Sequence, residues 1–108
     1  MSELRFALLL VMAISVSPAS AQMSPSEQRG YNIARTNCAR CHSIDKVTPS
    51  PLSAAPPFRT LHLRYPVETL EEALGEGIVT GHPAMPEFSF DADEVGAIID
   101  YLKSIQQR

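Results

Sequence analysis

The sequence has few of the features that stabilise a small domain, bind nucleic acid or anchor a chain in a membrane. Only two of its 108 residues are cysteine, Cys38 and Cys41. Because two residues separate them, a disulfide between them would restrain almost no chain entropy. The formal net charge is only −3, which argues against nucleic acid as a partner. The core therefore needs another source of stability, and a large apolar cofactor would supply it.

No stretch of the chain is long and apolar enough to be an obvious membrane span. The apolar run at residues 6–14 is about half of the ~20 residues that cross a bilayer. Arg5 precedes the run and Ala19-Ser20-Ala21 follows it, which is the order of a secretory signal peptide with its cleavage site. An amino-terminal membrane anchor is the alternative that the short run disfavours. We predict a signal peptide over residues 1–21 and one periplasmic domain over residues 22–108, with no stable membrane insertion after cleavage.

The first of three predicted helices begins after Ser24. Ser24 is a suitable N-cap, Pro25 fits the first helical position, and Glu27 completes a capping box. The helix is expected to run to about Asn37. Gly30 lies in its middle at a cost of roughly 1 kcal/mol relative to alanine, which indicates that another helix crosses there at close range.

The last predicted helix has Asp91 as its N-cap and Glu94 three residues later. A shorter helix is expected over residues 66–74, ending at Gly75 or Gly77. Residues 43–57 contain four prolines and are predicted to be loop. No repeat or strand pattern interrupts this order, so the predicted fold class is all-α. The apolar positions of the last helix recur at helical spacing: Val95, Ile98, Ile99, Leu102 and Ile105.

The motif Cys38-Ala39-Arg40-Cys41-His42 carries the chemistry. In an exported chain, C-x-x-C-H is typical of covalent haem c attachment. Each thiol adds to one vinyl group of the haem, and the adjacent His42 is placed to bind the iron. A thioredoxin-like dithiol is disfavoured because no strand precedes the motif. A structural zinc site needs four ligands, and neither His62 nor His82 has suitable spacing.

Met85 is the candidate for the sixth iron ligand. It lies in Gly81-His82-Pro83-Ala84-Met85-Pro86, an irregular stretch in which two prolines restrict the backbone. The only other methionine after the predicted cleavage site is Met23, close to that site. His82 and His62 are weaker rivals for the iron. Binding by His42 and Met85 would fill both axial positions and confine the iron to electron transfer.

These residues resemble the class I c-type cytochromes, in particular the small, single-haem bacterial type. The resemblance rests on the C-x-x-C-H motif, the helix carrying Gly30, Met85 between prolines and a closing helix with Tyr101. It implies a cytochrome c fold in which Gly30 and Ala34 contact Ile98 and Tyr101. It also implies a proline carbonyl that accepts a hydrogen bond from the proximal histidine. The sequence leaves Pro56 and Pro57 as equal candidates.

The predicted function is one-electron transfer between exported or membrane-bound redox partners, and not enzymatic catalysis. The chain would act alone or as the cytochrome subunit of a periplasmic oxidoreductase. The alternative is a haem enzyme or gas sensor with a labile sixth ligand. Charge is polarised along the chain, with six basic and two acidic residues over 22–64, and two basic and nine acidic residues over 65–108. Such a dipole would orient the protein toward a charged partner. The apolar residues expected around the haem are Leu61, Leu70, Leu74, Phe88 and Ile98.

Overall fold

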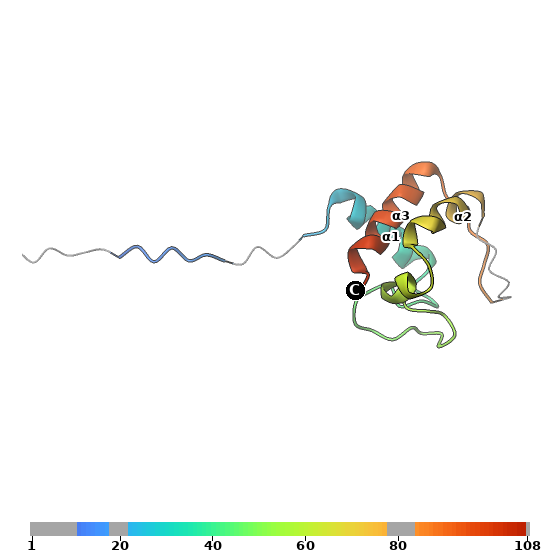
Figure 1. Cartoon of the computed structure of the whole chain (residues 1–108), viewed down its shortest axis with the longest axis horizontal. Coiled ribbons are helices and arrows are strands. Elements are labelled where there is room, and N and C mark those ends of the chain that lie inside the picture. Colours follow the sequence, from blue (N-terminus) through green and yellow to red (C-terminus); the bar gives the residue numbers. More distant parts are fainter. Residues whose placement is uncertain (1–10, 18–21, 78–83, 108) are drawn as a thin grey trace, which may run out of the picture.

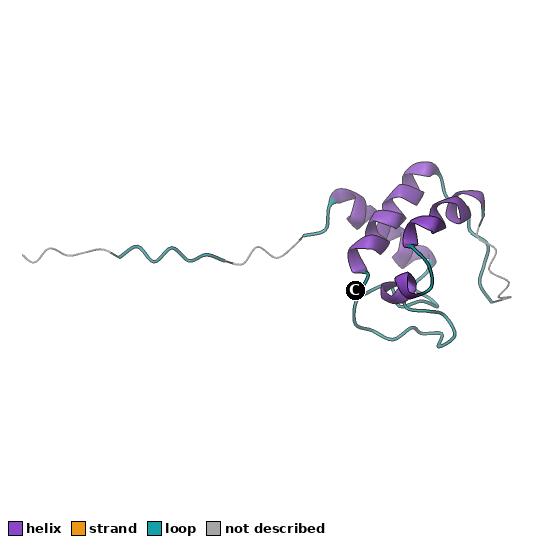
Figure 2. Ribbon diagram, viewed as in Figure 1, coloured by secondary structure: helices purple, strands orange, loops and turns teal. Residues whose placement is uncertain are grey.

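The computed structural model describes residues 11–17, 22–77 and 84–107. Its helical elements are α1 (Pro25–Asn37), the 3-10 helices η1 (Phe58–Leu63) and η2 (Val67–Thr69), α2 (Leu70–Glu76) and α3 (Ala92–Ile105). The described residues contain no strand (Figure 2). The all-α prediction is therefore confirmed, and so is the loop over residues 43–57. Residues 11–17 are exposed and have no regular structure, while the predicted cleavage site falls outside the described residues.

Both long helices begin where local sequence signals place them. The side chains of Ser24 and Asp91 each accept a hydrogen bond from the backbone of a glutamate three residues later, and that glutamate side chain accepts one in return. These capping boxes use amide hydrogens that have no partner within the helix. The predicted short helix begins as η2 and continues as α2 to Glu76, and Gly77 follows it with a φ of 116°. A side chain would strain the backbone there, so Gly77 rather than Gly75 ends the helix.

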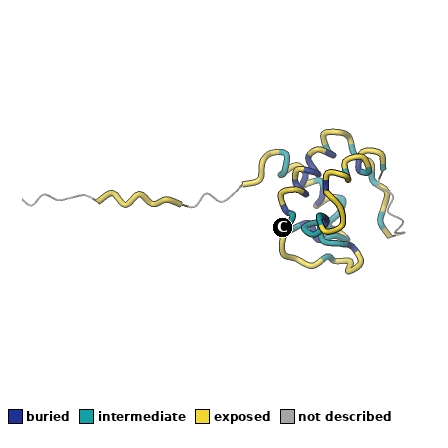
Figure 3. The backbone as a smooth tube through the Cα atoms, viewed as in Figure 1, coloured by how far each residue is buried: buried dark blue, intermediate teal, exposed yellow. Residues whose placement is uncertain are grey.

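Helices α1 and α3 cross in direct contact, as Figures 1 and 3 show. A Cβ atom added to Gly30 would lie 1.9 Å from the carbonyl oxygen of Ala97 and 2.8 Å from the Cβ atom of Tyr101. The expected contact with Tyr101 is therefore present, but Ala97 takes the place expected for Ile98. Successive helical residues point about 100° apart, and Ile98 instead belongs to the hydrophobic core.

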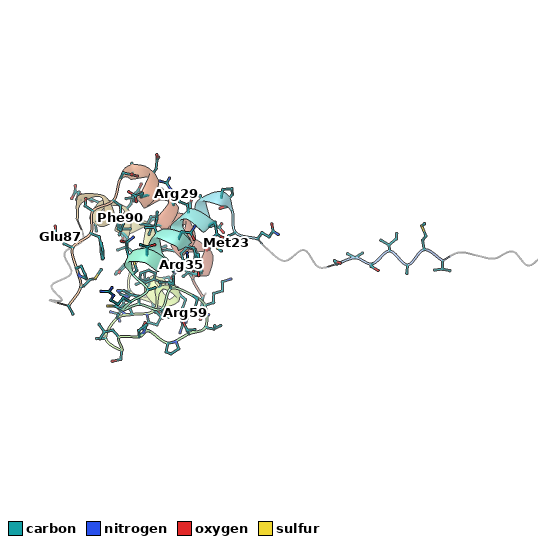
Figure 4. All side chains as sticks on the ribbon, turned by 180° about the vertical axis from the view of Figure 1, so that it is seen from behind. Met23, Arg29, Arg35, Arg59, Glu87 and Phe90 are labelled. Atoms are coloured by element: carbon teal, nitrogen blue, oxygen red, sulfur yellow. The ribbon has the colours of Figure 1, made fainter. Side chains whose placement is uncertain are left out.

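The core lies where α3 packs against η1, η2 and α2. Val67 is fully buried at its centre. Helix α2 lies in front of α3 in Figure 1, whereas α1 is nearer the viewer from behind in Figure 4. Helices α1 and α2 therefore lie on different sides of α3. The other buried members of the core cluster are Leu61, Leu74, Val95, Ile98, Ile99 and Leu102.

Candidate functional site

The C-x-x-C-H motif forms a tight turn directly after α1. The backbone N–H of Cys38 donates to the carbonyl of Ala34 at 2.8 Å and caps the helix. The N–H groups of Cys41 and His42 both donate to the carbonyl of Cys38, at 3.2 and 3.0 Å. Both thiols are free and half-buried. The turn therefore brings two thiols and one imidazole together on five consecutive residues.

The imidazole of His42 is held in a defined tautomer. Its Nδ1 lies 2.8 Å from the carbonyl oxygen of Pro56, and because a carbonyl only accepts hydrogen bonds, Nδ1 carries the proton. The lone pair of Nε2 is then available for a metal. The structure thus selects Pro56 over Pro57. The ring of Phe58 also packs against this imidazole, with centroids 4.8 Å apart.

A hydrogen-bond network shapes the loop that follows the motif. We call Cys38–Pro57 the attachment segment. The carboxylate of Asp45 accepts from the N–H of Val47 and from the N–H and hydroxyl of Thr48, all within 2.7 Å. The hydroxyl and backbone hydrogen bonds of Thr48, followed by that of Val47, lower the pKa of Asp45. These bonds close a turn without regular secondary structure.

Arg59 connects η1 to the attachment segment. One of its guanidinium nitrogens donates to the carbonyl of Thr48 at 2.7 Å, to the hydroxyl of Ser43 at 3.1 Å and to the carbonyl of Asp45 at 3.4 Å. Ser43 is 3% exposed, so its polar groups require partners inside the protein. Sequence analysis missed Ser43, Phe58 and Arg59, and their only signal was proximity to the motif and to the Pro56-Pro57 pair.

Tyr101 links the closing helix to the same segment. Its hydroxyl donates to the carbonyl oxygen of Ile44 at 2.5 Å, and the residue is 4% exposed. Burial, assisted by the neighbouring Tyr31 and Asp45, raises the pKa of Tyr101 to about 12. The ring also meets that of Tyr31 edge to face, with centroids 5.5 Å apart. A residue of α3 thus fixes the backbone two positions after His42.

Met85 lies in a second segment, Ala84–Phe90, which we call the methionine segment. Its carboxyl-terminal end is joined to α2, because the Ser89 hydroxyl donates to the carbonyl of Gly75 at 3.1 Å and the Phe90 N–H donates to the carbonyl of Leu74 at 2.9 Å. Met85 is half-buried.

The two rival histidines have different positions. The Nδ1 of His62 lies 2.9 Å from the side-chain oxygen of Gln106, so this ring takes part in a contact between η1 and the end of α3. His82 lies outside the described residues. Both described rings donate through Nδ1, and His42 is the one that directly follows the two thiols.

The chemistry of the donor set fits a covalently bound haem better than a redox dithiol. Burial raises the pKa of the Cys38 thiol to about 11, whereas redox-active cysteines have lowered pKa values.

Apolar side chains beside the core remain only half-buried and provide the kind of lining that a porphyrin needs. Of the residues expected around the haem, Leu61, Leu74 and Ile98 are buried in the protein core, and Leu70 and Phe88 are half-buried. The half-buried residues packed against the core are Ile33, Phe58, Leu70 and Phe90.

An all-α domain with a C-x-x-C-H turn and a histidine that offers Nε2 has the features of a small c-type cytochrome. Residues 25–102 match the family described as cytochrome c oxidase, cbb3-type, subunit III, and the chain belongs to that family. Its cofactor is covalently bound haem c with iron, and its function is electron transfer through the haem. Comparisons with curated proteins and with solved structures gave no significant match.

Proposed function

We propose that the chain is an exported one-electron carrier in which Cys38 and Cys41 form the thioether bonds and His42 and Met85 are the axial ligands. When bound, the haem iron supplies a ferrous–ferric couple. The protein residues hold the iron ligands, exclude water and present the site to a redox partner. A carrier requires that neither axial position be open to substrate.

The hydrogen bond from His42 to Pro56 carries this proposal. It fixes the proton on Nδ1, directs Nε2 to the metal and raises the basicity of the ring. Phe58 restricts rotation of the same ring. His62 also donates through Nδ1, but only His42 combines this bond with a position directly after two half-buried thiols.

Met85 as the sixth ligand is supported by how its segment is built. The segment is joined to α2 through Ser89 and Phe90, while Pro86 restricts the backbone directly after Met85. The rings of Phe88 and Phe90 stack at 5.9 Å and add apolar surface beside it. A thioether ligand favours the ferrous state and raises the reduction potential relative to a second histidine.

Export and partner binding form the second part of the proposal. The signal-peptide pattern of residues 1–21 supports delivery of the domain over residues 22–108 to the periplasm. No helix among the described residues has the length and hydrophobicity to span a bilayer. The family description favours a membrane-bound oxidase complex as the source or acceptor of electrons, with the domain as a subunit or as a free carrier.

The charge distribution favours an acidic partner surface at the attachment turn. Arg29 and Arg35 are exposed on α1 and Arg40 is exposed between the two cysteines, and Figure 4 labels the two α1 arginines in the view from behind. Helix α2 carries exposed acids, Glu71 and Glu72. We expect a complex that co-purifies at low salt and dissociates as salt rises, because screening weakens such steering.

Carbon monoxide binding to the haem-loaded protein tests the ligand assignment. The ferrous protein should bind carbon monoxide poorly and show the weak far-red methionine–iron band in its ferric state. Met85→Ala should remove the band and allow rapid carbon monoxide binding. Met23→Ala is the matched control, because Met23 is exposed just before α1, and it should behave like the unmutated protein.

The same measurement separates the carrier from a haem enzyme or gas sensor. If the unmutated protein binds carbon monoxide quickly and lacks the far-red band, Met85 is not the ligand and the enzyme or sensor alternative gains support. Covalent attachment is checked separately by a pyridine haemochrome spectrum after acid–acetone extraction. Haem that leaves the polypeptide under extraction would contradict thioether bonds to Cys38 and Cys41.

A further inference from the structure

The side chain of Gln106, the residue directly after α3, uses its full hydrogen-bonding capacity. Its oxygen accepts from the backbone N–H of His62 at 3.0 Å and from Nδ1 of the same residue at 2.9 Å. Its nitrogen donates to the carbonyls of Phe58 at 2.7 Å and Leu102 at 2.8 Å. A carboxamide offers two donors and two acceptor lone pairs, and here all four are matched. An apolar side chain at this position would leave all four of these backbone and side-chain partners without their bond to residue 106.

Gln106 bonds to two backbone groups of η1. The carbonyl of Phe58 and the N–H of His62 are four residues apart, and in a 3-10 helix, whose hydrogen bonds join residues three apart, these two groups are not partners of each other. The amide of Gln106 binds both of them. The start of η1 is therefore joined to the end of α3.

Phe58 is also the residue that contacts His42. Its ring packs on the imidazole at 4.8 Å, and its N–H donates to the carbonyl of Ser43 at 2.9 Å. Two residues earlier, Pro56 accepts the hydrogen bond from Nδ1 of the same imidazole. Residues 56–58 thus contact His42 through a hydrogen bond and through ring packing, and Gln106 holds the carboxyl end of this short segment.

We propose that Gln106 is a positioning residue for the iron ligand His42 and that it helps to set the reduction potential by fixing Pro56 and Phe58 against the imidazole. The proposal rests on the proposed function, because it requires His42 to bind the iron. Removing the amide loosens the Pro56 hydrogen bond and makes the imidazole a weaker donor. A weaker donor favours the ferrous state, so the potential rises.

The test compares substitutions of similar size in the haem-loaded protein. Gln106→Met keeps the length of the side chain and removes all four hydrogen bonds. We expect the equilibrium constant for reduction to increase about threefold, which is about 28 mV for a one-electron couple. Solvent exchange of the His42 Nδ1 proton, followed by NMR, should become faster. Gln106→Asn, which is one methylene too short to bridge Phe58 and His62, should change both quantities in the same direction if Gln106→Met does not fold.

Two controls separate positioning from general stabilisation. Gln107→Met removes the neighbouring amide, which donates to the carbonyl of Lys46 at 2.7 Å and not to Phe58. His62→Ala removes one bond to Gln106 and leaves those to the His62 backbone and to Phe58. Neither control should change the reduction potential or the exchange of the His42 Nδ1 proton. A lower free energy of unfolding in either control is compatible with the proposal.

Three results would overturn the proposal. The first is a Gln106→Met protein that is less stable but keeps the potential and the exchange rate of the unmutated protein. The second is an equal change of potential in Gln107→Met. The third is an unmutated protein without the hyperfine-shifted ring signals of an iron-bound His42. Only this third result would also contradict the proposed function, and it is measured on the unmutated protein alone.

Discussion

The attachment segment, which carries His42, and the methionine segment, which carries Met85, are held in different ways. In the attachment segment, side chains from outside it fix residues 43–48, among them those of Arg59 and Tyr101. The methionine segment is joined to α2 near its carboxyl-terminal end, by Ser89 and Phe90. Among the described residues, His42 is therefore held by more contacts than Met85. We therefore expect the two sides of the site to respond separately to mutation.

The largest effect is expected from Arg59→Met, which removes the guanidinium from the attachment segment. The buried hydroxyl of Ser43 and the carbonyls of Asp45 and Thr48 lose a charged donor. The free energy of unfolding should fall by about 2–3 kcal/mol. Urea unfolding of the haem-loaded protein measures this change. Carbon monoxide binding should stay slow, since the methionine segment is untouched.

Arg64→Met is the matched control for this prediction. Arg64 is exposed, so its replacement should change the free energy of unfolding by less than about 0.5 kcal/mol. Fast carbon monoxide binding by the Arg59 variant would show that the two segments are coupled, contrary to the comparison.

A smaller effect, on the opposite side of the site, is expected from Gly77→Ala. The φ of 116° at Gly77 is unfavourable for alanine, and the added Cβ would lie 2.9 Å from the carboxylate of Glu87. The cost should be about 1–2 kcal/mol. Because Glu87 belongs to the methionine segment, carbon monoxide association should become faster while the His42 proton exchanges as before.

Gly75→Ala provides the control two residues earlier. An added Cβ there would lie 4.0 Å from Val95, and alanine is the better helix former. The free energy of unfolding should rise by about 0.5–1 kcal/mol. Equal carbon monoxide kinetics in the two variants would contradict a specific role for the backbone at Gly77.

The smallest effect is expected from Tyr101→Phe and depends on pH. Loss of the hydrogen bond to Ile44 should cost about 1 kcal/mol at neutral pH. Burial favours the neutral phenol, so the pKa of Tyr101 rises from 10.0 to about 12 on folding. The stabilisation is complete below pH 10 and is lost as the pH rises toward 12.

The difference in unfolding free energy between Tyr101→Phe and the unmutated protein, measured from pH 8 to 12, isolates this titration. It should shrink above pH 10. Tyr65→Phe is the control, because Tyr65 is 38% exposed and its replacement should change the free energy of unfolding by less than about 0.5 kcal/mol. A constant difference for Tyr101 would contradict burial as the cause of its raised pKa.

Local signals in the sequence were sufficient to predict much of the fold. The capping boxes at Ser24 and Asp91 depend on residues three apart, and the close approach at Gly30 follows from the absence of a side chain. The C-x-x-C-H motif likewise carries its meaning within five residues. These features were predictable because each is determined by neighbouring residues.

The remaining features depend on contacts between distant parts of the chain. Whether Pro56 or Pro57 meets His42 is decided by the path of the whole loop. The 3-10 helix η1 was not predicted, and its contact with Gln106 joins residues 48 apart, Phe58 and Gln106. Periodicity and capping patterns contain no information about such pairs.

The crossing of α1 and α3 also has a consequence for biosynthesis. The side chains of Ser26 and Asp100, hydrogen-bonded at 2.6 Å, are 74 residues apart in the chain. Contacts of such long range carry a large loop-closure entropy and form late. The C-x-x-C-H motif also precedes α3 in the chain, so its thiols lack this helix until the contact between α1 and α3 has formed. We expect haem attachment to be easiest in that interval, before the last helix packs against the first.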